Sequence, residues 1–593
     1  MSISPYGSMR THGAGTLRAT DNGTVVTVAG WIQTRRDHGG VVFLDLRDRT
    51  GLVQVVVDPD ASDALRAAHR VRNEWVVSVT GTVRMRPDGM TNDRFASGEI
   101  EIAADDFTVL SAADTPPFPV EDDIEVAEEL RLRHRYVDLR RGEMAHVLTL
   151  RSRANALIRR VLERHGFLEI ETPTLTRATP EGARDFLVPS RLQPGQTYAL
   201  PQSPQLFKQL LMMSGFERYY QIARCFRDED LRADRQPEFT QLDIEMSFGS
   251  EDDIFGLVEE LLAEMWQELL DVTIPTPFPR MSYFEAMARF GSDKPDMRIA
   301  MELTELTVVF ANTDVSVFKQ VIEDGGIVVA LAVPNGAELT RRDFDNWVEW
   351  AKQRRAKGLA WGVVEDDGTL RSPLSKFMRD DELAAVLANT GAKPGDAVFF
   401  GAGEDHFTRN LMGALRVDIA HAQGLVDADR WEFLWITPMA LFEPVDGGGF
   451  KPGNHPFTAP SPEFLENFAA HPKTATSRGY DVILNGVELG GGSIRIHDRD
   501  VQLSMLEFLG IDAEQAEERF GFLLRALAHG APPHGGIAFG LDRLVMLLAN
   551  RSSIRDAIAF PKTQTGGCPL TEAPATFDDD ALRELGLRVL PRG

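Results

Sequence analysis

The sequence predicts an α+β protein of several domains, and three observations support this. Residues 1–112 read as five short strands, residues 218–248 as one antiparallel hairpin, and residues 421–560 return to strands and glycine turns after an α/β stretch. At 593 residues the chain is too long for a single hydrophobic core. We therefore expect an N-terminal barrel, a larger domain with an antiparallel sheet flanked by helices, and a module inserted into that domain.

The composition is that of a soluble globular protein, with 43% hydrophobic and 26% charged residues. The chain contains no run of about 18 uncharged apolar residues, and its N-terminus lacks an apolar signal core. We therefore expect a cytoplasmic protein that does not use a membrane. The two cysteines, Cys225 and Cys568, are too few for a zinc site, and a disulfide between them is not expected in the cytosol.

The net charge of −26 argues against a protein that coats nucleic acid non-specifically. The charge is reversed locally, because residues 131–164 contain ten arginines against the three acidic residues Asp138, Glu143 and Glu163. Such a basic segment suits one selected nucleic acid held in one place. The alternative is a charged helix face with intramolecular ion pairs.

The N-terminal strands match a small five-stranded barrel with a helical patch, residues 61–71, between the third and fourth strands. The strands are expected at residues 25–36, 39–48, 51–58, 75–86 and 98–110. Such barrels bind single-stranded nucleic acid by stacking bases on exposed aromatic side chains. Phe43 is a candidate platform, although an aromatic residue in a strand more often belongs to the core. The Pro-rich and acidic residues 114–129 are expected to be a linker.

A helix is predicted from the spacing of apolar residues over 150–162, and Gly166 ends it. The extended segment that follows is interrupted at Pro173. Residues 291–420 resemble an α/β insertion, in which we find no catalytic pattern.

The hairpin at residues 218–248 alternates with a period of two. One face, expected to be open, carries Phe239, Gln241, Asp243 and Glu245, and the packed face carries Leu242, Ile244, Met246 and Phe248. The connecting loop carries Arg227, Asp228, Glu229, Asp230, Arg232 and Arg235. A polar face beneath a charged loop is a plausible phosphate site, and the alternative is an ordinary solvated hairpin.

Residues 203–213 read as a helix with Ser203 as N-cap and Pro204 at its first position. Gln205 and Lys208 then share one face. A lysine this close to a helix N-terminus opposes the helix dipole, which favours an anionic target over the alternative of a surface lysine.

Residues 480–496 predict a second hairpin, with Asn485-Gly486 as its turn. In this register Ile483 is opposite Glu488 and Asp481 is opposite Gly490, so that Asp481 and Glu488 are diagonal neighbours. Two such carboxylates suit Mg²⁺ bound with phosphate, unless this is a surface hairpin. The glycines 490–492 permit a ligand to approach the backbone, and Arg495 follows.

Residues 535–548 read as an apolar strand, a glycine turn and a helix with Arg543 in its first turn. An arginine beside the free N–H groups of a helix N-terminus is a good phosphate clamp.

In this order, the segments resemble the signature motifs of class II aminoacyl-tRNA synthetases. The helix and extended segment ending at Pro173 match motif 1, FRDED through EFTQLD match motif 2, and GLDR matches motif 3. The segments TPEGARDF, QSPQLFKQLLM, GSDKPD, NGVELGGGSIRIH and GFLLRALAHGAPPHGG extend the match, and the full set resembles the bacterial-type aspartyl enzymes of subclass IIb. The nucleotide-site sequences of class I synthetases and P-loop ligases are missing.

The resemblance implies aspartate activation by ATP with Mg²⁺, followed by transfer of the aspartyl group to tRNA. It implies Arg227 and Arg543 as catalytic residues, and Asp481 and Glu488 as metal ligands. The ATP contacts it implies are Arg227, Asp228, Glu229, Gln236, Phe239, Glu488, Gly540, Leu541, Asp542 and Arg543.

The implied aspartate contacts are Glu181, Ser203, Gln205, Lys208, Arg227, Gln241, Asp243, His455 and Arg495. Lys208 and Arg495 would select aspartate over asparagine, because a neutral amide would leave two buried cations unpaired. The chain departs from the family at Asn454-His455, where many bacterial members show paired histidines.

In the N-terminal barrel, the resemblance implies anticodon contacts by Arg36, Phe43, Gln54 and Glu101. Members restricted to tRNA(Asp) often carry Leu after RRD and Lys in a later turn, whereas this chain has His38 and Gly89. This pair predicts an enzyme that also charges tRNA(Asn), and the alternative is strict use of tRNA(Asp).

The resemblance also predicts the domain organisation and a homodimer that pairs through residues 150–173. The expected domains are an OB-fold anticodon-binding domain (1–112), a hinge (113–145), catalytic residues with motifs 1 and 2 (146–290), an inserted GAD-type domain (291–420), and catalytic residues with motif 3 plus a C-terminal tail (421–593).

Four alternatives remain. An amide ligase is disfavoured by the barrel, and asparaginyl or lysyl relatives by Arg495 and the insertion. A catalytically silent nucleic-acid-binding protein is disfavoured by the presence of Arg227, Asp481, Glu488 and Arg543.

Overall fold

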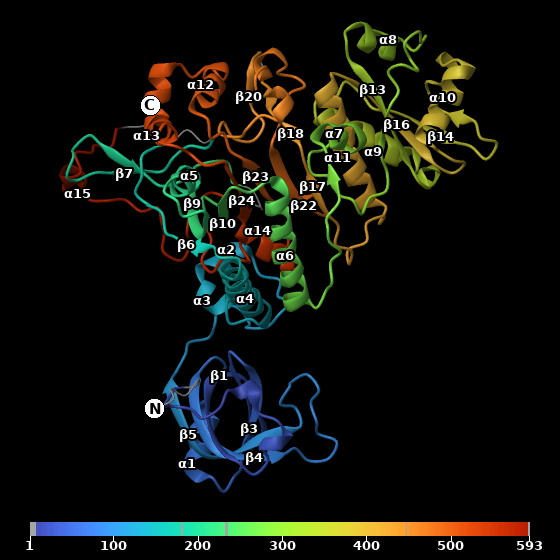
Figure 1. Cartoon of the computed structure of the whole chain (residues 1–593). Coiled ribbons are helices and arrows are strands. Elements are labelled where there is room, and N and C mark those ends of the chain that lie inside the picture. The colour runs from blue at the N-terminus through green and yellow to red at the C-terminus, as the bar shows by residue number, and fades with distance from the viewer. Residues whose placement is uncertain (1–6, 179–181, 232–234, 446–447, 591–593) are drawn as a thin grey trace. The chain divides into compact units, whose positions relative to one another are not determined.

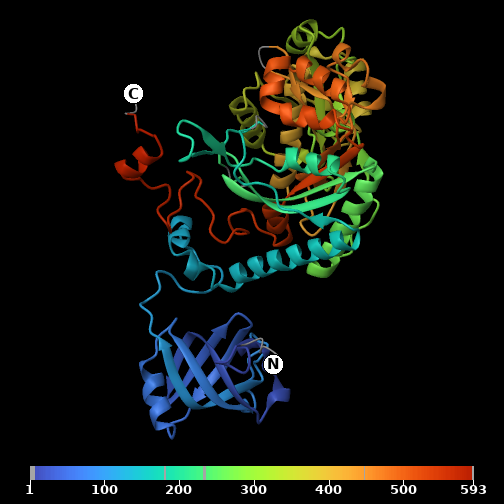
Figure 2. The same ribbon diagram turned by 60° about the vertical axis from the view of Figure 1, so that its left-hand side comes forward.

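The structure is a computed structural model of the chain and describes residues 7–178, 182–231, 235–445 and 448–590 (Figures 1 and 2). Internal contacts divide it into two compact units, Met1–Thr149 with Ile558–Thr576 and Leu150–Ala557 with Phe577–Gly593. We describe each unit by itself. Among the described residues, no helix is both long and apolar enough to cross a membrane.

The first unit contains the predicted five-stranded barrel, closed in the order β1-β2-β3-β5-β4. Alternate valine, leucine and isoleucine side chains of every strand fill its interior, as expected for strands that face a core on one side. The strands are β1 Val25–His38, β2 Val41–Asp48, β3 Gly51–Val57, β4 Val76–Met85 and β5 Ile100–Ser111, with helix α1 Ser62–Arg70 between β3 and β4.

Three helical segments follow the barrel, namely α2 Glu128–Arg133, α3 Arg135–Asp138 and the start of α4 Gly142–Arg164. In α3, buried Arg135 donates hydrogen bonds to the backbone carbonyl oxygens of Ile558 and Ala559, each at 3.0 Å. This contact fixes residues 558–559 against the segment that follows the barrel.

The second unit is built on an eight-stranded sheet in the order β11-β17-β22-β23-β24-β10-β9-β6. Neighbouring strands are antiparallel except in the pairs β11–β17 and β6–β9. The predicted antiparallel sheet is therefore confirmed. Its strands are β6 Leu168–Glu169, β9 Arg218–Phe226, β10 Glu238–Ser247, β11 Arg280–Met281, β17 Phe433–Ile436, β22 Gly479–Leu484, β23 Val487–Ile494 and β24 His534–Gly540.

Helices cover both faces of this sheet. Residues 150–164 of α4, α6 (Glu251–Leu270) and α14 (Leu541–Leu548) lie on one face (Figure 2). The other face carries α5 (Gln205–Met213) and α13 (Ala513–Leu527). Outside this layer are the short strands β7 Leu187–Pro189, β8 Thr197–Ala199, β18 Met439–Ala440, β19 Phe442–Pro444, β20 Phe450–Pro452 and β21 Thr476–Ser477, and helices α12 Arg499–Phe508 and α15 Asp579–Glu584.

The arginine-rich segment 131–164 is not an open basic surface. Arg160 and Arg164 on α4 form ion pairs with Glu264 and Glu268 on α6. Each of the other arginines also has a carboxylate or backbone carbonyl partner. The intramolecular pairing expected of the alternative is therefore present, while Arg133, Arg160 and Arg164 stay about half exposed. Nucleic-acid binding by this segment stays a prediction.

The β9–β10 hairpin has the predicted alternation, with two differences. Leu242, Ile244 and Met246 are buried on the packed face. Phe248 lies beyond the end of β10 with φ 61° and is 70% exposed, so it does not continue that face. The opposite face is open only at Phe239 and Gln241, which line a cavity, because Asp243 and Glu245 are buried under α5.

The β22–β23 hairpin shows a different register from the predicted one. Ile483 is opposite Glu488 as expected, but a β-bulge between Val482 and Ile483 places Asp481 opposite Gly491 instead of Gly490. A two-residue turn cannot predict a bulge further along the strand. Helix α5 also begins one residue later than predicted, at Gln205.

Residues 291–420 form the predicted α/β insertion, with a five-stranded antiparallel sheet in the order β12-β13-β16-β14-β15 and apolar side chains buried on both faces (Figure 1). The strands are β12 Leu303–Glu305, β13 Ile327–Val333, β14 Ala360–Val364, β15 Leu370–Arg371 and β16 Ala397–Gly403. Helices α7 Tyr283–Phe290, α8 Ser316–Glu323, α9 Arg341–Gln353, α10 Asp380–Thr390 and α11 Asp405–Ala422 accompany them.

Candidate active site

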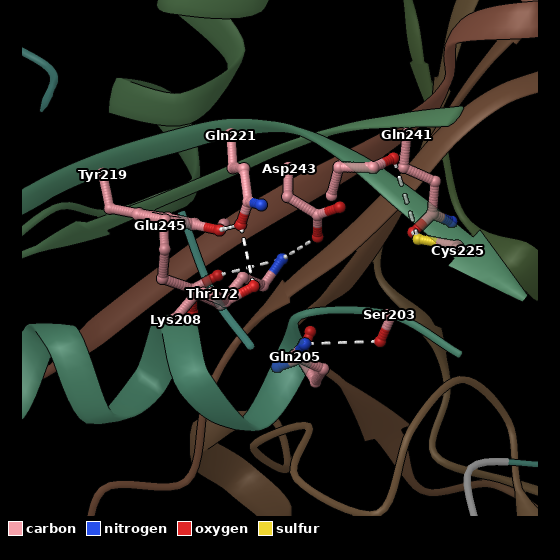
Figure 3. A network of polar contacts seen from close by, with 12 residues as sticks. Thr172, Ser203, Gln205, Lys208, Tyr219, Gln221, Cys225, Gln241, Asp243 and Glu245 are labelled. Carbon is pink, nitrogen blue, oxygen red and sulfur yellow. Dashed lines mark hydrogen bonds and ion pairs between the residues drawn. The ribbon is translucent and has the colours of Figure 1, made fainter. Parts of the chain in front are cut away.

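A buried lysine is at the centre of the polar cluster between α5 and β10. Lys208 Nζ lies 3.0 Å from Asp243 Oδ1 and 3.3 Å from Glu245 Oε2 (Figure 3). The three side chains are almost completely excluded from solvent. The sequence places them together because the period of β10 puts Asp243 and Glu245 on one face, and α5 packs its first turns on that face.

Arg495 enters the same cluster from the residue after β23. Its guanidinium donates to Glu245 Oε1 at 3.0 Å and to Oε2 at 3.2 Å, and also to Ser493 Oγ at 2.8 Å. Burial alone would raise the pKa of Glu245, but the charges of Arg495 and Lys208 outweigh burial and lower it. Glu245 is therefore a fixed anion between two fixed cations.

Asp243 Oδ2, Gln205 Nε2 and His455 Nε2 are buried polar atoms of this cluster that have no hydrogen-bond partner among the residues that the structure describes. Burial raises the pKa of Asp243 more than the charge of Lys208 lowers it. Unsatisfied buried acceptors and donors are costly, so a polar ligand that pairs with them is favoured.

His455 is neutral in this environment. Burial and the charges of Arg495 and Lys208 lower its pKa to about 3. Its Nδ1 accepts a hydrogen bond from the backbone N–H of Phe457 at 3.4 Å. Since Nδ1 is an acceptor, the proton of the neutral ring is on Nε2, which is the unpartnered atom.

Two other predicted aspartate contacts flank this cluster. Gln241 lies next to Asp243 along the same face of β10, and its Oε1 lies 3.3 Å from Cys225 Sγ (Figure 3). Ser203 Oγ accepts from the backbone N–H of Gln205 at 3.3 Å. Glu181 lies outside the described residues.

A cavity of about 250 Å³ continues along the hairpin from Gln241. It is lined by the predicted residues Arg227, Glu229, Gln236, Phe239, Gln241, Glu488, Gly540, Asp542 and Arg543, together with Arg235 and Leu489. The Arg227 guanidinium lies 4.9 Å from the centroid of the Phe239 ring. Arg543 Nη1 donates to the backbone oxygen of Glu488 at 2.9 Å. The side chains of Arg227 and Arg543 and the ring of Phe239 therefore line the same cavity.

Two predicted nucleotide contacts do not line the cavity, and a third, Asp542, lines it but is hydrogen-bonded within the protein. Leu541 is fully buried and Asp228 does not line the cavity, so neither side chain faces it. The Asp542 carboxylate accepts from the backbone N–H of Thr240 at 2.7 Å and pairs with Arg151 of α4. Asp542 thus joins β10, α14 and α4, the segments assigned to the three motifs.

Glu488 lines this cavity, and the carboxylate of Asp481 lies beside that of Glu488, next to Gly491. A Cβ added at Gly491 would lie 2.4 Å from Asp481 Oδ1 and 3.5 Å from Glu488 Oε1, so only a glycine leaves room for both carboxylates. Burial and the neighbouring charge of Glu488 raise the pKa of Asp481 well above its usual range. A divalent cation would remove this repulsion, and carboxylate oxygens are the ligands that Mg²⁺ prefers.

The described residues contain no group of three or more His, Cys, Asp or Glu side chains that could hold a metal by themselves. A cation at Asp481 and Glu488 would therefore take its remaining ligands from water and phosphate. This is the usual coordination of Mg²⁺ in nucleotide sites, so the residues fit the predicted metal.

A separate polar face lies on the barrel and contains the four predicted anticodon residues. Arg36 pairs with Asp45 at 3.0 Å and donates to Gln54 at 3.4 Å, and Gln54 donates to Glu101 at 2.9 Å. Phe43 is opposite Arg36 on the neighbouring strand and is only partly buried. The predicted discriminating position His38 contacts Phe43, with ring centroids 6.0 Å apart. Gly89 is in a turn with φ 79°.

Comparison with known proteins agrees with this arrangement. The family described as "tRNA synthetases class II (D, K and N)" matches residues 127–564, and the OB-fold nucleic acid binding domain matches residues 26–110. The chain belongs to the class II tRNA synthetases. Its sites described above thus lie in the catalytic and OB-fold parts of such an enzyme.

Similar class II synthetases include proteins named Aspartate--tRNA(Asp/Asn) ligase. The protein from Thermobifida fusca is 53% identical, with 98% of this chain and 99% of that protein covered. The protein from Mycobacterium tuberculosis is 52% identical, with 98% and 99% covered.

Among solved structures, asparaginyl-tRNA synthetase from Pyrococcus horikoshii superposes with a TM-score of 0.57 at 19% identity, covering 92% of this chain and 96% of that chain. A putative aspartyl-tRNA synthetase from Leishmania major gives a TM-score of 0.57 at 18% identity, covering 95% and 96%. These two structures show the class II fold.

Sequence reasoning missed two residues of this synthetase. Glu245 was placed on the correct face by its period but given no role, although it pairs with both Lys208 and Arg495. Asp45 pairs with Arg36 on the barrel face. In each case the available signal was an acidic residue between two apolar neighbours in a strand, because a buried carboxylate needs a partner.

Proposed function

We propose that this chain is an aspartate–tRNA ligase, which forms aspartyl-adenylate from L-aspartate and ATP and transfers the aspartyl group to tRNA(Asp) and tRNA(Asn). The observation that carries the proposal is the buried pair of cations, Lys208 and Arg495, beside the cavity lined by Arg227, Phe239 and Arg543. The names of the relatives, Aspartate--tRNA(Asp/Asn) ligase, support it.

The substrate amino acid fits the cluster by charge. Lys208 and Arg495 attract its side-chain carboxylate, while the unpartnered Oδ2 of Asp243 accepts from its ammonium group. Neutral His455 and Gln205 present N–H donors to the remaining carboxylate oxygens of the substrate. Asparagine would bring a neutral amide to two buried cations, which is the costly arrangement.

ATP fits the adjoining cavity. Adenine stacks on Phe239, and Arg227 and Arg543 neutralise the phosphates during displacement of pyrophosphate by the aspartate carboxylate. Arg227 stands between the two ligands, since it lines the ATP cavity and its charge acts on His455 in the aspartate cluster. Positioning and charge neutralisation are the protein's contribution to this step. Glu229 and Gln236 complete the nucleotide contacts.

Asp481 and Glu488 would hold Mg²⁺ at the edge of the ATP cavity. The bound ion would neutralise phosphate charge and aid departure of pyrophosphate. Gly491 leaves the space that this arrangement needs.

The tRNA anticodon is read by the barrel face that carries Arg36, Phe43, Gln54 and Glu101, through stacking and hydrogen bonds to base edges. His38 beside Phe43 and Gly89 in its turn favour use of both tRNA species. The test is aspartylation of purified tRNA(Asp) and tRNA(Asn) under identical conditions. Charging of both is expected; charging of tRNA(Asp) alone would leave a strictly discriminating ligase.

The enzyme is proposed to act as a homodimer that pairs through residues 150–173. Leu168 is 50% exposed and Leu175, just beyond, is 52% exposed, as expected for apolar side chains that a second subunit covers. Sedimentation analysis should give twice the chain mass, and a fully active monomer would contradict the proposal. The cytoplasmic location stays a prediction.

A further inference from the structure

A buried arginine connects the inserted domain to the proposed metal site. Arg416 is on α11 and is fully buried. Its Nε donates to the backbone oxygen of Met301 at 2.6 Å, and its Nη2 donates to those of Asp296 and Ile299 at 2.9 and 2.7 Å. One side chain thus fixes three carbonyl groups of residues 291–301, the loop that leads from α7 into the inserted domain.

Arg416 does not have the usual carboxylate partner of a buried arginine. No carboxylate forms an ion pair with it among the described residues, and its Nη1 is buried without a hydrogen-bond partner. The guanidinium instead lies over the Phe290 ring, 4.8 Å from its centroid. Burial lowers its pKa to about 10. A buried charge of this kind is costly, so a purely structural packing position would be filled better by an apolar residue.

The loop held by Arg416 packs directly on the turn of the β22–β23 hairpin. A Cβ added at Gly486 would lie 3.1 Å from the Cβ of Asp296. The Asp296 carboxylate is itself fixed by Arg298, which donates from Nε at 3.0 Å and from Nη2 at 2.8 Å. Arg416 therefore acts on the turn through the backbone at Asp296.

The same turn is held from its other side. The Asn485 side chain accepts from the backbone N–H of Glu432 at 2.9 Å and donates to the backbone oxygen of Arg430 at 2.9 Å. The turn is thus clamped between residues 430–432 and the loop. Because Asp481 and Glu488 flank this turn on its two strands, any shift of the turn changes the spacing of their carboxylates.

The loop also brings charges toward the metal carboxylates. Asp293 and Lys294 both act electrostatically on Asp481, with opposite signs. The geometry of the loop therefore affects both the position and the local charge of the proposed Mg²⁺ site.

We propose that Arg416 of the inserted domain is a positioning residue for the metal hairpin: by holding the loop 291–301 against the turn at Gly486, it sets the affinity of Asp481 and Glu488 for Mg²⁺. This proposal rests on the proposed function. The inserted domain then has a defined task in amino-acid activation, which is to support the metal site from outside the catalytic sheet.

The test compares Arg416→Gln with Arg409→Gln. Arg409 is on the same helix but pairs with Glu305 and Asp405, outside the loop. Hydrogen exchange of the metal-free proteins should be faster at residues 291–301 and 484–488 in Arg416→Gln and unchanged in the control. The Mg²⁺ concentration for half-maximal pyrophosphate exchange should rise about tenfold, as for loss of an outer-shell partner. The KM for aspartate should not change.

Arg416→Gln could also unfold the inserted domain, which loss of protection in β13 and β16 would reveal. Arg298→Gln then decides, because it releases Asp296 and leaves Arg416 in place; it should shift the Mg²⁺ requirement in the same direction. An unchanged Mg²⁺ requirement in a folded Arg416→Gln or in Arg298→Gln overturns the inference. Absence of aspartate-dependent exchange in the wild-type protein would instead contradict the proposed function.

Discussion

Arg495 donates two hydrogen bonds to Glu245, at 3.0 and 3.2 Å, in a site from which water is excluded. Lys208, which is on helix α5, pairs with the same carboxylate. The two cations that we propose to select aspartate are thus paired with anions of the protein itself. In the proposed function, aspartate would bind to cations that are already oriented, which reduces the entropy lost on binding.

Replacing Glu245 should destabilise the catalytic domain. Glu245→Gln leaves Arg495 buried without a carboxylate, and removal of one partner of a buried pair costs about 3 kcal/mol or more. Urea unfolding followed by tryptophan fluorescence measures this loss. Glu443→Gln, which breaks the more exposed pair with Lys451, should have a much smaller effect. Equal stability of the two variants would contradict a buried ionic cluster.

Replacing Arg495 should impair aspartate recognition specifically. Arg495→Leu removes one of the two cations that we propose to bind the substrate carboxylate, so kcat/KM for aspartate should fall by more than about tenfold. The KM for ATP should change little, because Arg495 does not line the ATP cavity. A near-wild-type kcat/KM for aspartate would disprove its role.

His455 should make stability depend on pH in a known direction. Its pKa is lowered to about 3 in the folded protein, so the unfolded chain binds its proton first as pH falls below about 6.5. This residue therefore destabilises the folded state increasingly in acid.

We expect His455→Gln to gain about 2 kcal/mol relative to wild type between pH 8 and pH 5. Urea unfolding of both ligand-free proteins at the two pH values measures the difference. No relative gain, or a relative loss in acid, would show that His455 is not held neutral.

Adding one methyl group at Gly491 should disable the metal site. In Gly491→Ala the new Cβ would lie 2.4 Å from Asp481 Oδ1, so the two carboxylates must separate and exchange activity should fall at least about tenfold, without rescue by excess Mg²⁺. Gly256→Ala on α6 is the control, because no heavy atom lies within 4 Å of its added Cβ. Full activity of Gly491→Ala would exclude the pair as metal ligands.

The barrel should decide which tRNA is charged. Introducing the residues typical of restricted family members, His38→Leu with Gly89→Lys, should lower aspartylation of tRNA(Asn) and preserve that of tRNA(Asp). Neither change touches the catalytic domain, so the rate of aspartate activation serves as the internal control. Equal loss with both tRNA species would contradict a specific role for His38 and Gly89.

The alternation of apolar and polar residues and the positions of turn-forming residues predicted the strands and helices that build the site. Alternation in β10 placed Gln241, Asp243 and Glu245 on one face, and Gly540 before Arg543 correctly marked the strand-to-helix turn. The sequence could not show that this face is covered by α5, because that contact depends on tertiary packing. Lys208 consequently had a surface position as its alternative, whereas the structure buries it completely.

The remaining differences have similar physical causes. The bulge beside Ile483 changed the partner of Asp481, and strand pairing is not encoded in a two-residue turn. Arg160 and Arg164 of α4 pair with acidic residues of α6 that are about one hundred positions away in sequence. Local composition could not show these ion pairs, because the acidic partners are distant in sequence.

Exchange of labelled pyrophosphate into ATP by the purified wild-type chain tests the central claim most directly. We predict exchange that requires L-aspartate and Mg²⁺ and that is not supported by asparagine or lysine. Absence of exchange with aspartate, or equal exchange with asparagine, would contradict the assignment of Lys208 and Arg495 to the aspartate side chain.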